Sequence, residues 1–263
     1  MIEWRSVTKR YAGAASVAVD NFSYTVATGS FTVLLGSSGS GKSTLLSMIN
    51  RMVEPTQGTV LIDGVDVAGE NPVALRRRIG TVLQNGGLFP HRRVIDNVAT
   101  AARLNGASKA QARAAAAEKM ELVGLDVSLA QRYPAQLSGG QAQRVGVARA
   151  LSGGADILLM DEPFGAVDPI QRRALQHEIV DLHDRLGTTI VFVTHDVDEA
   201  LLLADDIIVL EEHARIAQAG SPAELLERPA NDFVRDFLGK HRGLRLEGGR
   251  VVDADGRVLG VME

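Results

Sequence analysis

Short apolar segments alternate along the chain with longer segments in which apolar residues recur at helical spacing. The segments Phe31–Leu35, Ile157–Met160 and Thr189–Thr194 are almost entirely apolar, which is typical of strands buried on both faces of a parallel sheet. Because helical segments separate them, the pattern predicts an α/β fold with a mostly parallel core sheet covered by helices. Further strands are predicted at Val60–Ile62, Ile79–Leu83 and Ile207–Leu210. Helices are predicted at Ile170–Leu186 and Val197–Ala204. Two more helices are predicted to start at Lys42 and at Pro222, the latter with Ser221 as its cap.

Two regions depart from this alternation. Ile2–Val7 and Val17–Val26 alternate apolar with polar residues and predict an N-terminal antiparallel β-subdomain. Residues 91 to about 152 contain helical runs, including the Ala-rich run Ser108–Val123 with Ser108 as N-cap. They predict a helical subdomain inserted into a domain that spans residues 1–240. Residues 241–263 form a short extension, in which the Asp255-Gly256 turn signal predicts a β-hairpin.

Composition narrows the functional classes. A formal net charge of −4 and a pI near 5.9 do not indicate a broad basic face, so no nucleic-acid partner is expected. The absence of cysteine excludes disulfides and thiolate metal sites. The first residues lack the layout of a secretory signal, and no apolar run approaches the roughly 18–20 residues that span a bilayer. A role at a membrane would therefore need a partner that crosses it.

One loop carries the clearest chemistry. It follows the buried strand that ends at Leu35 and consists of Gly36, Ser37, Ser38, Gly39, Ser40, Gly41, Lys42, Ser43 and Thr44. This order fits the phosphate-loop pattern, in which glycines let successive N–H groups converge on phosphate oxygens and the next helix adds its positive end. Lys42 is expected to reach the β- and γ-phosphates of ATP, and the Ser43 hydroxyl to ligate Mg²⁺.

Two further segments suit phosphate chemistry. Asp161 and Glu162 follow an apolar strand, at the sheet edge where α/β proteins bind ligands. Asp161 is expected to hold the Mg²⁺ shell through water, and Glu162 to polarise the attacking water as general base. The second segment is a helix start with a hydroxyl and two glycines, which either binds phosphate or caps a turn. Its residues are Leu137, Ser138, Gly139, Gly140 and Gln141.

The order and spacing of these three motifs resemble those of the ABC ATPase family over about residues 1–240. The resemblance implies roles for four more residues. Tyr11 matches the aromatic residue that stacks on adenine, the alternative being an ordinary core or surface tyrosine. Gln84 matches the glutamine that senses Mg²⁺ and the attacking water. Asp168 falls in the loop that crosses between subunits, and His195 matches the histidine that contacts the γ-phosphate.

The resemblance also implies partners. In the ABC family two cassettes sandwich two ATP molecules head to tail. We therefore expect a homodimer or paired cassettes, in which Ser138–Gln141 of one chain completes the phosphate loop of the other. Catalysis would then consist of positioning and charge stabilisation, with ATP-driven closure as the power stroke. An integral membrane permease is expected to dock near Gln84–Arg93. Leu88 and Phe89 would be apolar contacts there and Arg92 with Arg93 a charged rim, unless Leu88 and Phe89 only pin the loop to the core.

Two stretches narrow the resemblance. Ile79–Gln84 continuing to Gly87–His91, and Pro163–Ile170 followed by Arg172, resemble the ATPase subunits of osmoprotectant importers, which handle glycine betaine, choline, carnitine or proline betaine. The resemblance implies a peripheral ATPase subunit at the cytoplasmic face of the membrane, served by a separate solute-binding protein. The alternatives are an importer of another small polar solute, such as an amino acid or polyamine, and a non-transport ABC ATPase.

Overall fold

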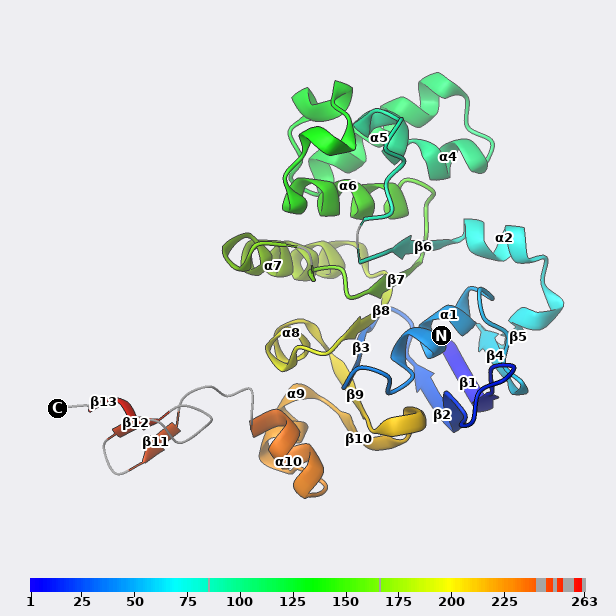
Figure 1. Ribbon diagram of the computed structural model, residues 1–263. Helices are drawn as coiled ribbons and strands as arrows, with labels where there is room; N and C mark the ends of the chain where they lie inside the picture. The colour runs from blue at the N-terminus through cyan, green and yellow to red at the C-terminus, as the bar shows by residue number, and fades with distance from the viewer. Residues whose placement is uncertain (85, 166, 240–244, 248–249, 253–257, 262–263) are drawn as a thin grey trace.

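A six-stranded sheet forms the centre of the computed structural model, which describes residues 1–84, 86–165, 167–239, 245–247, 250–252 and 258–261. The strand order is β10-β9-β3-β8-β7-β6, and all neighbours are parallel except the antiparallel edge pair of β10 with β9. The predicted α/β fold with a mostly parallel core sheet is confirmed. The strands are β3 (Phe31–Gly36), β6 (Ile79–Val82), β7 (Ile157–Asp161), β8 (Thr189–Thr194), β9 (Asp206–Leu210) and β10 (Ile216–Gly220) (Figure 1).

The two faces of this sheet have separate hydrophobic cores. Phe31, Val33 and Leu35 of β3 belong to one core, and Leu34 of the same strand belongs to the other, as the two-residue period of a strand requires. The first core also contains residues of α7 (Pro169–Leu186) and α8 (Val197–Leu203), and the second contains residues of α1 (Lys42–Ile49). Helices therefore bury both faces, which explains why the strands are apolar throughout.

A second, four-stranded antiparallel sheet packs on the α1 side. Its order is β2-β1-β4-β5, and its strands are β1 (Ile2–Lys9), β2 (Val19–Val26), β4 (Gln57–Ile62) and β5 (Val65–Asp66). Trp4 joins the sheet to the core: its ring meets Phe22 edge-on at 5.5 Å, and its Nε1 donates to the carbonyl of Leu45 in α1 at 3.3 Å. The predicted antiparallel pairing at the N-terminus is confirmed.

Helices occupy the chain between β6 and β7, and Figure 1 shows them grouped at the top of the molecule. They are α3 (Val94–Val98), α4 (Thr100–Leu104), α5 (Lys109–Leu122) and α6 (Gly139–Leu151), with short 3-10 turns at Val127–Gln131 and Pro134–Gln136. Ser108 caps α5 as predicted, in a reciprocal capping box with Gln111. We call these helices the helical lobe.

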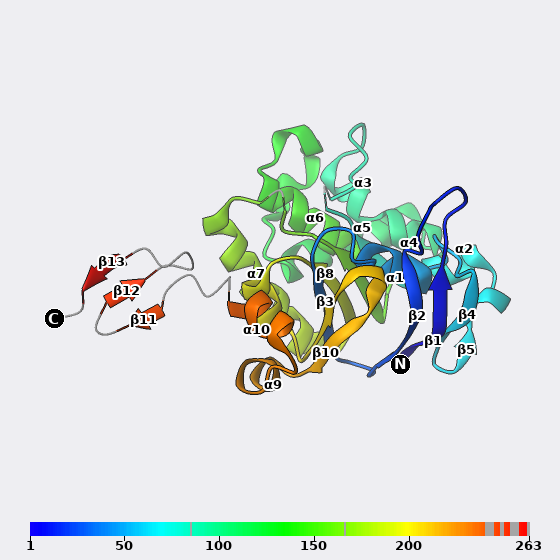
Figure 2. The ribbon, with the colours of Figure 1, turned by 60° about the horizontal axis from the view of Figure 1, so that its bottom comes forward.

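The remaining elements lie outside these groups. α2 (Pro72–Arg77) precedes β6, and 3-10 turns lie at Val67–Gly69 and Glu212–Ala214. α9 (Pro222–Glu227) starts after the Ser221 cap, as predicted, and Figure 2 shows it beside α10 (Asp232–Gly239) and β10. In the extension, β12 (Arg250–Val252) pairs antiparallel with β11 (Arg245–Glu247) and with β13 (Val258–Val261). The predicted Asp255-Gly256 turn lies outside the described residues.

Within the described part of the chain, no helix is both long and apolar enough to cross a membrane.

Candidate nucleotide site

The loop between β3 and α1 is curled by glycines. Gly39 has φ +82° and Gly41 has φ +99°, a left-handed conformation that glycine adopts without steric cost. A side chain on Gly41 is excluded for a second reason, because its Cβ would lie 2.7 Å from the carbonyl oxygen of Ala18. The curled loop leads directly into α1 at Lys42, so the positive end of the helix faces the loop.

The Lys42 ammonium lies inside this loop. Lys42 is only 5% exposed, and its Nζ donates to the carbonyl oxygens of Gly36 at 2.8 Å and Ser37 at 2.6 Å. Burial lowers the pKa of Lys42, while the carboxylates of Glu162 and Asp161 act in the opposite direction. An ammonium held among acceptors at the base of a glycine loop is suited to a phosphate, which offers stronger acceptors than carbonyls.

Two side-chain oxygens that could ligate Mg²⁺, those of Ser43 and Asp161, meet beside the loop. The Ser43 hydroxyl donates to Asp161 Oδ1 at 2.9 Å, although the two residues come from α1 and β7. Burial raises the pKa of Asp161, and its bond to Ser43 offsets part of that effect. Mg²⁺ prefers such hard oxygens and usually takes only one or two carboxylates, with water and substrate phosphates completing its shell. No cluster of three or more metal-binding side chains occurs among the described residues.

Glu162 and His195 come together at the ends of neighbouring strands. His195 Nδ1 lies 3.3 Å from Glu162 Oε2, and the backbone N–H of Glu162 donates to the carbonyl of Val193 in β8 at 3.0 Å. Glu162 also has φ +43°, in a region that a non-glycine residue enters at a cost of order 1–3 kcal/mol. Strain of this kind clusters at active sites, although Ser6, Asn21, Arg51, Asp63, His213 and Ala214 of this chain also have positive φ.

Three other predicted residues lie around this centre. Gln84 is exposed beside the turn that follows Glu162, since a Cβ on Gly165 would be 3.2 Å from Gln84 Nε2. The Tyr11 hydroxyl lies 3.3 Å from Thr44 Oγ1, so its half-exposed ring stands next to the last residue of the phosphate loop. Stacking of Tyr11 on adenine stays a prediction, as does the role of Asp168, which directly precedes α7.

The segment Ser138–Gln141 forms the start of α6. Ser138 is the N-cap, and it shares a capping box with Gln141, whose N–H donates to Ser138 Oγ at 3.3 Å. A hollow of about 350 Å³ lies beside this helix start. Within the described residues it is lined by the helical lobe, by the residues that follow α5 and by α7, and by no residue of the loop Gly36–Thr44. The two predicted phosphate-binding motifs therefore do not share this hollow.

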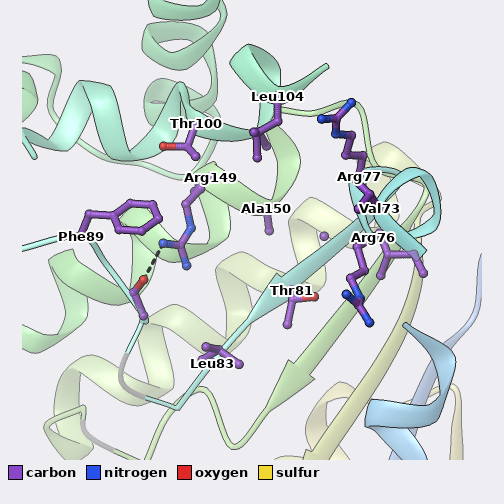
Figure 3. A pocket seen from close by; sticks show the side chains of 14 residues that line it. Val73, Arg76, Arg77, Thr81, Leu83, Phe89, Thr100, Leu104, Arg149 and Ala150 are labelled. Atoms are coloured by element: carbon purple, nitrogen blue, oxygen red, sulfur yellow. Dashed lines mark hydrogen bonds between the residues drawn. The ribbon is translucent and has the colours of Figure 1, made fainter. Parts of the chain in front are cut away.

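A larger apolar groove of about 480 Å³ lies on another face, between α2, β6 and the helical lobe (Figure 3). Phe89 lines it, whereas Leu88 packs on the core, and a permease contact of Phe89 stays a prediction. Arg92 stacks over the Phe89 ring at 4.8 Å, whereas Arg93 turns to Gln131 and Tyr133.

Sequence reasoning missed the other wall of this groove. Val73, Arg76 and Arg77 of α2 and Arg149 of α6 line it together with Leu83. Arg149 donates to the carbonyls of Gly87 at 2.7 Å and Gly86 at 2.8 Å, and so fixes the loop after Gln84 to α6 (Figure 3). The Asn71 cap followed by Pro72 was the sequence signal that could have revealed α2.

Comparison with known proteins agrees with this geometry. The family model described as ABC transporter matches residues 19–165. The chain is 49% identical over 247 residues to the glycine betaine uptake system ATP-binding protein YehX of Escherichia coli, covering 94% of this chain and 79% of that protein. It is 46% identical over 242 residues to the carnitine transport ATP-binding protein OpuCA of Listeria monocytogenes, covering 92% of this chain but only 60% of that protein.

Solved structures show the same fold. The dimeric structure of MJ0796, a bacterial ABC transporter cassette, superimposes with a TM-score of 0.76 at 32% identity, covering 84% of this chain and 99% of that one. A post-hydrolysis state of the same cassette, bound to ADP and Pi, gives the same TM-score at 31% identity. The family model matches more than half of this chain, and a relative covered to 79% of its length is 49% identical. This chain belongs to the ABC transporter family.

Proposed function

We propose that this chain is the ATP-hydrolysing subunit of an ABC importer and energises uptake of a compatible solute such as glycine betaine or choline. Its place is the cytoplasmic face of the cell membrane, as a peripheral subunit. The observation that carries the ATPase role is the convergence of Lys42, Ser43, Asp161, Glu162 and His195 at one sheet edge. The solute class is supported by 43–49% identity to ATPase subunits whose names state glycine betaine, carnitine or choline transport.

Hydrolysis follows from the roles of these side chains. Lys42 exchanges its loop carbonyls for the β- and γ-phosphate oxygens of ATP. Ser43, Asp161 and Gln84 would hold Mg²⁺, which would neutralise charge on the phosphates when bound. Glu162 accepts a proton from the attacking water, and His195, 3.3 Å away, orients Glu162 and donates toward the γ-phosphate. The strained turn at Glu162 fixes the carboxylate at this position.

The active form is a dimer of cassettes in this proposal. Among the described residues, the hollow beside Ser138–Gln141 contains no residue of the phosphate loop of its own chain, which supports treating each motif as half of a site. A second copy related by two-fold symmetry supplies both missing halves at once. The dimeric structures of MJ0796 support this arrangement.

The permease docks in the groove of Figure 3 in this proposal. The groove is open, mostly apolar and continuous with the loop after Gln84, so a helix seated there contacts the loop that reaches the nucleotide. Arg76, Arg77 and Arg149 line it, and no acidic residue does so among the described residues. We therefore assign the charged rim of the groove to Arg76, Arg77 and Arg149, in place of the pair Arg92 and Arg93.

Charge reversal at single arginines tests whether the permease docks in this groove. We expect Arg77→Glu to weaken association with the permease by about tenfold or more, because complementary charges set the rate and register of docking. Basal ATPase activity of the purified subunit should be unchanged. Arg93→Glu is the matched control, because Arg93 contacts Gln131 and Tyr133 instead of the groove. Co-purification with the permease measures the effect, and equal assembly of all variants would refute docking at this groove.

Stimulation by solute tests the importer class. The complete complex, with permease and the separate solute-binding protein, is reconstituted in vesicles and its ATPase rate is measured with different external solutes. We expect glycine betaine, choline or carnitine to raise the rate. A rise with an amino acid or a polyamine instead would favour the alternative, an importer of another small polar solute. Activity that no solute or permease changes would favour a non-transport ABC ATPase.

A further inference from the structure

One acidic side chain is buried among the described residues, and it lies just behind the site. Glu199, in the first turn of α8, is 6% exposed. Its Oε2 accepts a hydrogen bond from Thr194 Oγ1 at 2.7 Å, and its Oε1 accepts one from Gln176 Nε2 of α7 at 3.1 Å. Burial raises the pKa of Glu199, and the bond from Thr194 opposes that shift. A carboxyl placed here at such a desolvation cost needs an explanation, because an apolar residue would fill the same space without that cost.

The hydrogen bonds around Glu199 form an altered helix cap. In an ordinary capping box, the glutamate three residues after the cap accepts directly from the N–H of the capping residue. Here Asp196 is the cap, and its N–H donates to Thr194 Oγ1 at 2.9 Å. The Thr194 hydroxyl in turn donates a hydrogen bond to Glu199 Oε2. His195 lies between Thr194, which carries this hydroxyl, and Asp196, whose N–H donates to it, so the backbone on both sides of His195 is fixed.

Arg172 of α7 connects the start of α8 to the loop between β7 and α7. Arg172 Nη2 donates to the carbonyl of Val167 at 3.3 Å, and its Nη1 lies 3.9 Å from Asp196 Oδ2. Gln176, one turn further along α7, is 6% exposed and holds Glu199 from that helix. The end of β8, the start of α8 and α7 therefore meet at one buried carboxyl.

We infer that Glu199 is a positioning residue for hydrolysis, acting through Thr194 to hold His195 against Glu162. The inference rests on the proposed role of His195. Its side chain is 62% exposed and contacts Glu162 at 3.3 Å, so little other packing fixes its direction. The buried Thr194–Glu199 pair supplies the rigidity that the exposed histidine lacks. Glu199 itself touches neither phosphate nor water in this scheme.

Three single variants and one double variant test this inference through the pattern of their kinetic effects. Glu199→Leu removes both acceptors, and we expect a fall in kcat of about tenfold or more with KM for ATP within about twofold, because misplacement affects the reacting geometry more than binding. Glu199→Gln keeps an acceptor for Thr194, and a flipped Gln176 amide can pair with its new NH₂, so we expect near wild-type kcat. Thr194→Val should match Glu199→Leu, and the double variant should be no worse than either single one, because both remove the same link.

Two controls make each outcome decisive. Leu225→Ala, in α9, creates a buried cavity away from the site and should lower the melting temperature while kcat, measured where every variant is folded, stays unchanged. His195→Ala is measured in parallel. If His195→Ala keeps wild-type kcat, the proposed role of His195 fails. If His195→Ala loses activity but Glu199→Leu does not, or if the Thr194 and Glu199 losses are additive, the positioning role of Glu199 is overturned.

Discussion

Replacing Glu162 by glutamine should lower the rate of ATP hydrolysis by at least about a hundredfold, because the amide cannot accept the proton of the attacking water. ATP binding should persist and become somewhat tighter. Glu162 stands close enough to Lys42 to oppose the lowering of the Lys42 pKa by burial, so the same negative charge also repels the phosphates of ATP. With binding intact and hydrolysis blocked, the nucleotide should hold two chains together as a dimer.

Three measurements separate these effects. Single-turnover hydrolysis reports the chemical step, calorimetry reports ATP affinity, and analytical ultracentrifugation with ATP reports dimer formation. Glu118→Gln is a suitable control, since it removes an exposed carboxylate of α5 and should change none of the three. Wild-type turnover in Glu162→Gln would refute the general-base assignment.

Much of the fold could be predicted because its signals are local. The apolar run of β3, the glycines after it and the helix start at Lys42 lie within twenty residues, and each predicts its own conformation. Two short elements escaped prediction. α2 was missed although Asn71 and Pro72 signal its start, and β10, with the sequence Ile-Ala-Gln-Ala-Gly, lacks the apolar run of the core strands and is ordered by its pairing with β9.

The site shows the same limit. The motif residues were identifiable because their order along the chain is diagnostic of the family. The contacts that place them were not, because these join distant segments. Arg149 lies more than sixty residues from the two glycines it holds, and Glu199 meets Gln176 across 23 residues of sequence. Neither residue has a local signal that distinguishes it from an ordinary surface arginine or a helix-capping glutamate.

The helix start at Ser138 permits a sharper test of its two interpretations. As a capped turn, it needs only a good N-cap, and aspartate is one of the best. As a phosphate site, it needs the absence of negative charge, because its N–H groups and helix dipole face an anion. Ser138→Asp keeps the cap and adds the charge. If Ser138 only caps α6, this variant should be as active and as stable as the wild type.

We expect Ser138→Asp and Lys42→Ala each to abolish detectable turnover, and their mixture to recover it. Lys42→Ala removes the buried ammonium at the base of the phosphate loop. In a mixed dimer, one site combines both defects, while the other joins an intact loop to an intact helix start from the opposite chain. Equal amounts give mixed dimers in about half of the population, each with one of two sites intact, so up to about a quarter of wild-type activity should return. Steady-state ATPase assays of each variant alone and of the mixture measure this recovery. A mixture as inactive as its components would mean that both motifs act on the ATP of their own chain, in conflict with the separate hollow beside Ser138.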